Sequence, residues 1–221
     1  MRTGTAGSSV LGTFHADSAQ SVMERVVNDI GISPVSFQAT DVVVIAGLSK
    51  PLGQQKQLRR TTQVAETYKV NEAGDGEELQ IGFQDLLTYD PKLDQLVATP
   101  ILWDSHSKSG SSQKIAKIAK EQNVEYVAAL RNIGTRAIIR KILVEGCTMT
   151  EQDLTSPEWL VQANNKFWGI GSAIVERDGA LSHGKLLEEW LSWFRSEAPD
   201  VDLSTIDCTF SGVGLNGLTN D

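Results

Sequence analysis

The sequence has few cysteines and no long apolar run, and each absence excludes a class of protein. Only two cysteines occur in 221 residues, Cys147 and Cys208, and neither has a metal-ligand partner nearby. This usage favours free thiols in a reducing compartment over a disulfide, and it predicts no metal site. No apolar run approaches the roughly 18 residues that a membrane-spanning helix needs. The first residues lack the basic and apolar regions of a signal peptide, so we expect none.

The charge of the chain is one-sided. It has 28 acidic and 20 basic residues, which gives a formal net charge of −8 at pH 7. Such a surface repels phosphate backbones, so we expect no nucleic-acid partner. The hydrophobic content of 40% and the charged content of 22% are those of an ordinary globular protein, and the length fits one large domain or two small ones.

The first hundred residues have the pattern of a sheet protein. The β-branched run at 41–46 suits a strand that is covered on both faces. Asp17 or Ser18 can cap a helix whose apolar residues continue to Ile30. We expect strands over residues 10–15, 41–46, 58–68, 79–89 and 96–103.

The pattern changes after residue 104. A Ser/Gly-rich linker is followed from Gln113 by the apolar spacing of helices. Beyond residue 165 we expect a loop-rich stretch, one amphipathic helix from about His183 to Arg195, and a loose tail. These changes divide the chain into a sheet region (1–104), a helical region (105–165) and an extension (166–221).

A cluster of polar side chains follows the first expected strand. Thr13, His15 and Asp17 lie at positions i, i+2 and i+4, a spacing that places them on one face of a strand. An imidazole at a strand end can contact the γ-phosphate of a nucleotide or the water that attacks it. The alternative is that His15 is half-buried and bonded to its own turn.

Two adjacent arginines, Arg59 and Arg60, lie on the polar strand at 58–68. A guanidinium group binds the oxygens of a phosphate through paired N–H donors, so a functional role is contact with a nucleotide held by a neighbouring subunit. The alternative is a solvated edge strand whose charges prevent pairing with another sheet.

The stretch RTGTAGSSVLGTFHADSA resembles the His-box region of the secretion-motor ATPases. These are the hexameric ATPases of type II and type IV secretion, of type IV pili and of the archaeal flagellum. In that family a Thr-Gly pair precedes a strand that ends in Thr-x-His-Ala, and a helix with an arginine follows. Gly4 and Arg25 stand at the corresponding positions here. The similarity extends over roughly residues 1–165, most closely to the archaeal branch.

The resemblance implies an α/β fold, the C-terminal half of a RecA-like ATPase core with a mixed sheet, followed by a helical region. It implies Thr13 and His15 as catalytic residues, and Gly4, Arg59 and Arg60 as residues that bind ATP. The cofactors would be ATP and Mg²⁺. The family further implies a homo-hexamer in the cytoplasm that contacts an inner-membrane platform protein, and hence a place at the membrane periphery.

The chain departs from the family in one respect that bears on activity. It contains no G-x-x-x-x-G-K-[ST] string, the loop whose backbone and lysine hold the phosphates of ATP. The acidic Walker B strand of the family precedes the Thr-Gly pair, and Met1 lies after that point. We therefore expect a C-terminal segment that binds ATP and Mg²⁺ only together with the missing N-terminal half. The alternatives are a non-catalytic interaction module derived from the family and an unrelated binding domain.

Overall fold

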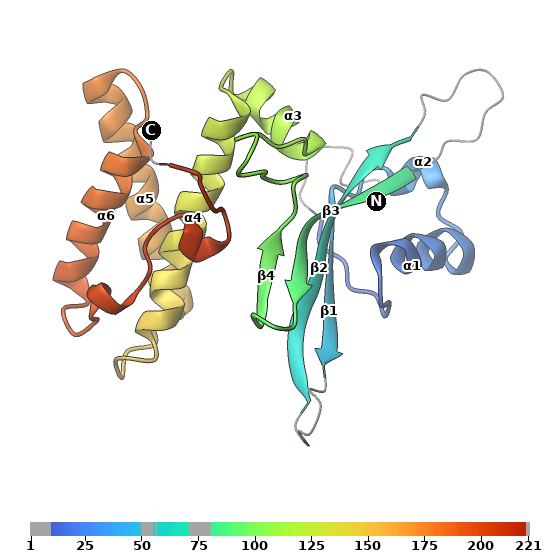
Figure 1. The fold of residues 1–221 in the computed structure, drawn as a ribbon, viewed down its shortest axis with the longest axis horizontal. Coiled ribbons are helices and arrows are strands. Elements are labelled where there is room, and N and C mark those ends of the chain that lie inside the picture. The colour runs from blue at the N-terminus through green and yellow to red at the C-terminus, as the bar shows by residue number, and fades with distance from the viewer. Residues whose placement is uncertain (1–9, 50–54, 56, 71–80, 220–221) are drawn as a thin grey trace. The chain divides into compact units, whose positions relative to one another are not determined.

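The computed structural model describes residues 10–49, 55, 57–70 and 81–219. The chain divides into two compact units, residues 1–118 and 119–221 (Figure 1). The boundary between the two units falls within the helix Gln113–Glu121. The first unit is a sheet with short helices and the second is helical, so the chain has the mixed α/β composition that the sequence predicts.

The first unit contains a four-stranded sheet in which every described strand pair is antiparallel. Its strands follow one another in the order β1-β2-β3-β4. Short connections between consecutive strands permit antiparallel pairing, whereas parallel pairing needs a long crossover. The described strands therefore do not form the expected mixed sheet. Their bounds are Val42–Ser49 (β1), Leu58–Lys69 (β2), Ile81–Asp90 (β3) and Gln95–Ala98 (β4).

The expected strand at 10–15 is wrong. Residues 10–16 are irregular, and Leu11 is 95% exposed. A strand needs a neighbour to pair its backbone groups, and no described strand lies against this segment. The residues of the expected His-box strand are therefore present without the pairing that would make them a strand.

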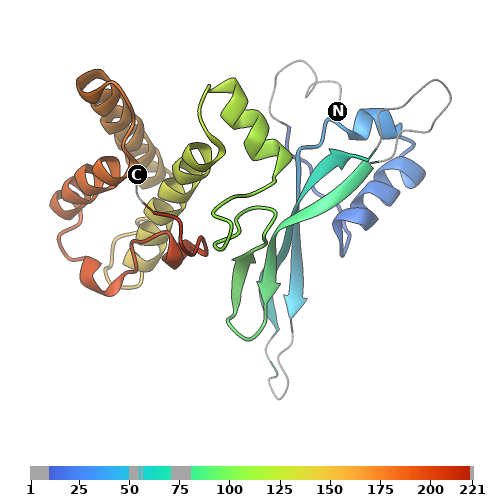
Figure 2. The same ribbon diagram turned by 45° about the horizontal axis from the view of Figure 1, so that its top comes forward.

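One face of the sheet packs against helix α1, which spans Ala19–Glu24 (Figure 2). Ala19 contributes to a buried cluster with Val43, Ile45 and Ala65. The alternate residues Val42 and Val44 of β1 are 43% and 58% exposed. The prediction that this strand is covered on both faces is wrong, because the described part of the chain covers one face of β1.

Two short helical elements follow α1. A π-helical turn at Arg25–Asp29 continues it, and α2 spans Pro34–Phe37. The ring of Phe37 packs edge-on against Phe83 of β3 at 6.3 Å between centroids. This contact extends the buried cluster along the face that α1 covers.

A buried carboxylate joins the sheet to the start of helix α3, Gln113–Glu121. Glu66 of β2 has no exposed surface. One oxygen accepts from the backbone N–H of Gln113 at 2.8 Å and from the side-chain amide of Gln84. The other accepts from the Ser112 hydroxyl at 2.5 Å and from the N–H of Lys114 at 3.1 Å. The carboxylate thus satisfies N–H groups that the first turn of a helix leaves unpaired.

Three long helices form the second unit. They are α4 (Tyr126–Gly146), α5 (Pro157–Asp178) and α6 (His183–Glu197), followed by 3₁₀ turns at Leu203–Thr205 and Ser211–Val213. Trp190 stacks on Phe194 at 5.2 Å and donates its ring N–H to the carbonyl of Ala163, which fixes α6 against α5. The amphipathic helix expected at 183–195 is confirmed.

Two features of this unit differ from the sequence prediction. The stretch after residue 165 is not loop-rich, since α5 runs through it without a break. Gly171 is buried within this helix, where a Cβ would lie at ordinary contact distance from Leu186 and Leu181, 3.5 and 3.7 Å away. The tail is also packed. Its side chains Phe210, Leu215 and Leu218 are buried, and Phe210 lies against the bare face of Gly134 in α4.

We expect Glu66→Gln to lower the free energy of unfolding by about 2–4 kcal/mol. The reason is that the amide nitrogen of glutamine must face at least one of the four hydrogen-bond donors around Glu66, and an amide nitrogen cannot accept a hydrogen bond. Urea unfolding followed by circular dichroism measures the loss. Hydrogen exchange should also become faster at the amides of Gln113 and Lys114.

The matched control is Glu176→Gln, which makes the same chemical change at an exposed position of α5. We expect it to change stability by less than about 0.5 kcal/mol. Equal effects of the two substitutions would contradict the role assigned to Glu66.

Candidate functional site

The segment that carries Thr13 and His15 is held by the start of α1. Ser18 is the N-cap, and its hydroxyl accepts from the N–H of Ser21 at 3.2 Å. The backbone N–H of Ala19 donates to the side-chain oxygen of Gln63 on β2 at 3.1 Å. The amide of Gln63 in turn donates to Asp85 of β3 at 2.7 Å. The end of this segment is therefore fixed on the sheet, while the residues before it extend into solvent.

Asp17 belongs to the cap and not to an acid–base pair. Its carboxylate accepts from the Ser21 hydroxyl at 2.8 Å. This hydrogen bond is the main reason that the pKa of Asp17 lies below its ordinary value, and the charge of Arg25 contributes in the same direction. Asp17 is thereby kept ionised close to the exposed side chain of Arg25.

Thr13 and His15 are both exposed. No hydrogen bond of the His15 ring occurs within the described residues, so the alternative of a half-buried histidine bonded to its own turn is wrong. A hydroxyl and an imidazole in this position can donate to or accept from a group that approaches from solvent. Gly4, the other predicted residue of this segment, lies outside the described residues.

The two predicted arginines have different surroundings. Arg59 is exposed at the start of β2. It stands four residues before Gln63, the residue that binds the start of α1, and four residues span about 13 Å along a strand. Arg60 forms a paired contact with Asp94, with Nε–Oδ1 at 2.6 Å and Nη2–Oδ2 at 2.7 Å. Arg59 is therefore available to an incoming oxyanion, whereas the guanidinium of Arg60 is already bound to a carboxylate.

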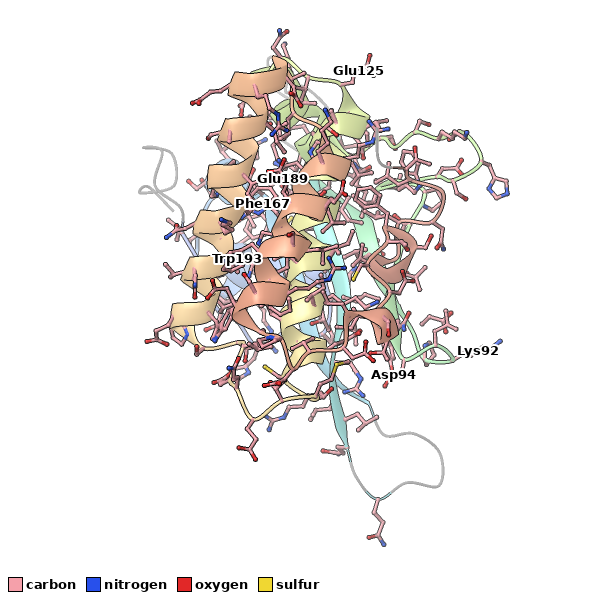
Figure 3. The ribbon with its side chains drawn as sticks, turned by 90° about the vertical axis from the view of Figure 1, so that its left-hand side faces the viewer. Lys92, Asp94, Glu125, Phe167, Glu189 and Trp193 are labelled. Carbon is pink, nitrogen blue, oxygen red and sulfur yellow. The ribbon has the colours of Figure 1, made fainter. Side chains whose placement is uncertain are left out.

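Tyr89 completes the contact around Asp94, which lies at the β3–β4 turn (Figure 3). Its hydroxyl donates to Oδ1 of Asp94 at 2.7 Å. Hydrogen bonds from Arg60 and then Tyr89 hold the pKa of Asp94 far below its ordinary value. The same bond to Asp94 raises the pKa of Tyr89. No local sequence pattern indicates this cluster, because Asp94 stands 34 residues after Arg60.

A second polar turn, at Asp104–Ser109, brings an aspartate, a histidine and a serine together. Asp104 accepts from the backbone N–H of His106 at 2.9 Å and from the Ser107 hydroxyl at 2.9 Å, and these bonds lower its pKa. A nucleophilic serine would need its hydroxyl bonded to the imidazole. Ser107 instead donates to the carboxylate, and the His106 side chain is 97% exposed. The arrangement is a turn and not a catalytic triad.

Open grooves lie in the second unit. One, of about 730 Å³, runs between α5 and α6, with Val161 and Gly169 on one wall and Glu189 and Trp193 on the other (Figure 3). Glu189 is paired there with Arg177 at 3.2 Å, and Lys166 lies 5.8 Å from the ring of Trp193. The groove is open to solvent, so it would enclose little of a small ligand, whereas ligand sites bury most of the ligand surface.

Within the described ranges, no group of three or more His, Cys, Asp or Glu side chains is placed to hold a metal ion. Among the described helices, none combines the length and the apolar character that crossing a lipid bilayer requires. Comparison with models of known protein families and with curated protein sequences gives no match for this chain.

We expect Asp94→Asn to weaken the Arg60 contact and to lower the pKa of Tyr89 towards its ordinary value of about 10. Because folding lowers the pKa of Asp94, its ionised form stabilises the folded state above about pH 3.9, the unfolded value. That contribution is lost as the pH falls below this value. The stability difference between the parent and Asp94→Asn should therefore be present at neutral pH and shrink in strong acid.

NMR titration of the Tyr89 ring and urea unfolding at both pH values measure these effects. The control is Asp29→Asn, at an exposed aspartate at the end of the π-helical turn. An unchanged Tyr89 titration in Asp94→Asn would show that the cluster does not form in solution.

Proposed function

We propose that this chain is the C-terminal segment of a hexameric secretion-motor ATPase of the type II, type IV pilus and archaeal flagellum class. Thr13 and His15 would contribute to an ATP site whose phosphate loop and acidic strand lie on another polypeptide. The observation that carries the proposal is the His-box string itself, ending in Thr13-Phe14-His15, on an exposed segment fixed by its C-terminal end to the sheet.

The unpaired edge of β1 supports the proposal that another polypeptide completes the sheet. Among the described strands, β1 pairs with β2 alone, so one row of its backbone groups has no strand opposite. The strand carries no charged residue from Val42 to Ser49, and natural sheets usually protect such an edge with charge or proline. Val42, Val44 and Leu48 are also exposed, as are Val10 and Leu11. Another polypeptide that supplies strands here would pair the edge and cover these side chains.

Completion of the sheet would also account for the irregular form of residues 10–15. These residues have the loose alternation of a strand, and none of the described strands pairs with them. We propose that a strand from the N-terminal half provides it, which would turn the antiparallel sheet into the mixed sheet of a RecA-like core.

The residues present are suited to contact the phosphate oxygens or the attacking water, and not to form the loop that holds the phosphates. The Thr13 hydroxyl and the His15 imidazole can hydrogen-bond to phosphate oxygens or hold the attacking water in place. The exposed Arg59 can contact a phosphate held by a neighbouring subunit. When bound, Mg²⁺ neutralises charge on the phosphates, and the described residues offer it no carboxylate cluster. Its ligands would therefore come from the N-terminal half.

The family resemblance also extends the proposal to the assembly and its location. The active form would be a homo-hexamer in the cytoplasm, peripheral to the membrane and in contact with an inner-membrane platform protein. The second candidate is a non-catalytic interaction module derived from the same family. The absence of a phosphate-binding loop from the sequence favours that alternative.

We expect the purified chain alone to hydrolyse no ATP and to bind it weakly. Mixed with the polypeptide encoded immediately upstream, provided that this carries a phosphate loop, it should gain ATPase activity. His15→Ala should then lower kcat by roughly 100- to 1,000-fold, the range for loss of a group that acts in the transition state. Steady-state phosphate release measures the rate.

The control is His106→Ala, which removes an exposed imidazole from the Asp104–Ser109 turn and should leave kcat unchanged. Tight ATP binding by the chain alone, or full activity of His15→Ala in the mixture, would contradict the proposal. A mixture that assembles without turnover would favour the interaction module.

A further inference from the structure

Helix α1 is too short to hold its own position. It has six residues, whereas isolated helices of fewer than about 12 residues are marginal in water. Two small side chains of α1, Ala19 and the partly buried Val22, pack against buried residues of β1 and β2. Small side chains bury little apolar area, so polar contacts at the start of the helix help to decide where it lies.

A chain of two hydrogen bonds ties the start of α1 to the sheet. The backbone N–H of Ala19 donates to Oε1 of Gln63 at 3.1 Å, and Nε2 of Gln63 donates to Oδ1 of Asp85 at 2.7 Å. Ala19 is the first residue of the helix, so its N–H is one of the donors that a helix leaves unpaired. The chain of bonds thus runs from β3 through β2 to the first turn of α1.

The orientation of the Gln63 amide is fixed by the chemistry of its two partners. A backbone N–H can only donate a hydrogen bond, and an ionised carboxylate can only accept one. The amide oxygen must therefore face Ala19, and the amide nitrogen must face Asp85. A reversed amide would place donor against donor and oxygen against oxygen, which would lose both bonds. Asp85 thereby holds the acceptor of Gln63 in the direction of the helix.

Little chain separates this anchor from His15. Ser21 donates its hydroxyl to Asp17 at 2.8 Å and its backbone N–H to Ser18 at 3.2 Å, so the turn before the helix is also fixed. Ala16 is the one residue between this turn and His15. Two steps along the backbone span at most about 7.6 Å between Cα atoms. The position of the imidazole therefore follows the position of the helix start.

We infer that Gln63, oriented by Asp85, is the positioning residue for His15. This role rests on the proposed function, in which the imidazole acts on a phosphate or on an attacking water held by another polypeptide. Preorganised groups accelerate a reaction because their place is set before the target arrives. Gln63 itself acts through the backbone of α1 and contacts no reacting atom.

Substitutions of nearly equal size test the chain of hydrogen bonds. Gln63→Glu places a second carboxylate against Asp85, and the repulsion should break the chain. Asp85→Asn alone should leave it intact, because the new amide can turn its oxygen towards Gln63. The two changes together should restore it, since the carboxylate at position 63 then accepts from both the new amide and Ala19. Recovery of this kind reports a specific hydrogen bond rather than the filling of space.

Hydrogen exchange and ¹⁵N relaxation of the full chain alone give the first readout. In Gln63→Glu the amide of Ala19 should exchange at least about 10-fold faster than in the parent, because its hydrogen bond is lost. The backbone at 13–17 should gain motion. Both measurements should return to the parent values when Asp85→Asn is added.

The control is Gln57→Glu, which makes the same chemical change at an exposed position just before β2. It should alter neither measurement. Thermal unfolding of all the variants separates a local loss from a loss of fold. Unchanged exchange at Ala19 in Gln63→Glu, or no recovery when Asp85→Asn is added, would overturn the positioning role.

Steady-state ATPase rates of the mixture with the upstream polypeptide give the second readout. Gln63→Glu should lower kcat at least about 10-fold and leave KM for ATP within about two-fold, because the other polypeptide holds the nucleotide. Addition of Asp85→Asn should recover most of kcat. An active parent mixture in which Gln63→Glu keeps the full kcat would overturn the positioning role and leave the proposed function standing. An inactive parent mixture would contradict the proposed function, and the exchange measurement would then decide whether Gln63 fixes the His15 segment.

Discussion

The buried carboxylate of Glu66 is the constraint on which the first unit depends. A buried carboxylate is costly unless its oxygens are hydrogen-bonded, and this one accepts from Gln84 of the neighbouring strand, from Ser112 and from two backbone N–H groups of α3. One side chain thus links two strands, the loop after the sheet and the start of a helix. Residues 105–112, which the sequence presents as a polar linker, therefore end at a fixed point on the sheet.

The sequence predicted elements whose pattern is local and missed those that depend on distant partners. The strands β2 and β3 and the helix α6 were found because alternation or helical spacing is contained within each segment. The segment 10–15 has the residues of a strand but no described neighbour, so its pattern alone could not decide its structure. The continuous α5 was missed because Gly169 and Gly171 resemble loop residues. Leu186, which lies near Gly171, belongs to another helix, so no local pattern shows that this glycine stands in a buried part of a helix.

The candidate site shows the same limit. Adjacent arginines at 59 and 60 look equivalent in sequence, yet one is exposed and the other is bound to Asp94 with the help of Tyr89. That difference arises at a turn 34 residues away, where no local signal points back to Arg60. The start of the helix after His15 was easier to predict, because Ser18 is a recognisable helix cap. On the proposed function, the role of His15 depends on groups that another polypeptide would supply.

The edge of β1 is left without a neighbouring strand among the described residues. The edge of β1 presents backbone donors and acceptors in a row, and another strand satisfies them only in one register, so the partner there must bring extended chain of matching length. An edge contact between identical β1 strands would leave the exposed Val10–Phe14 segment still unpaired. On the proposed function, the edge of β1 would therefore receive a strand from a different polypeptide.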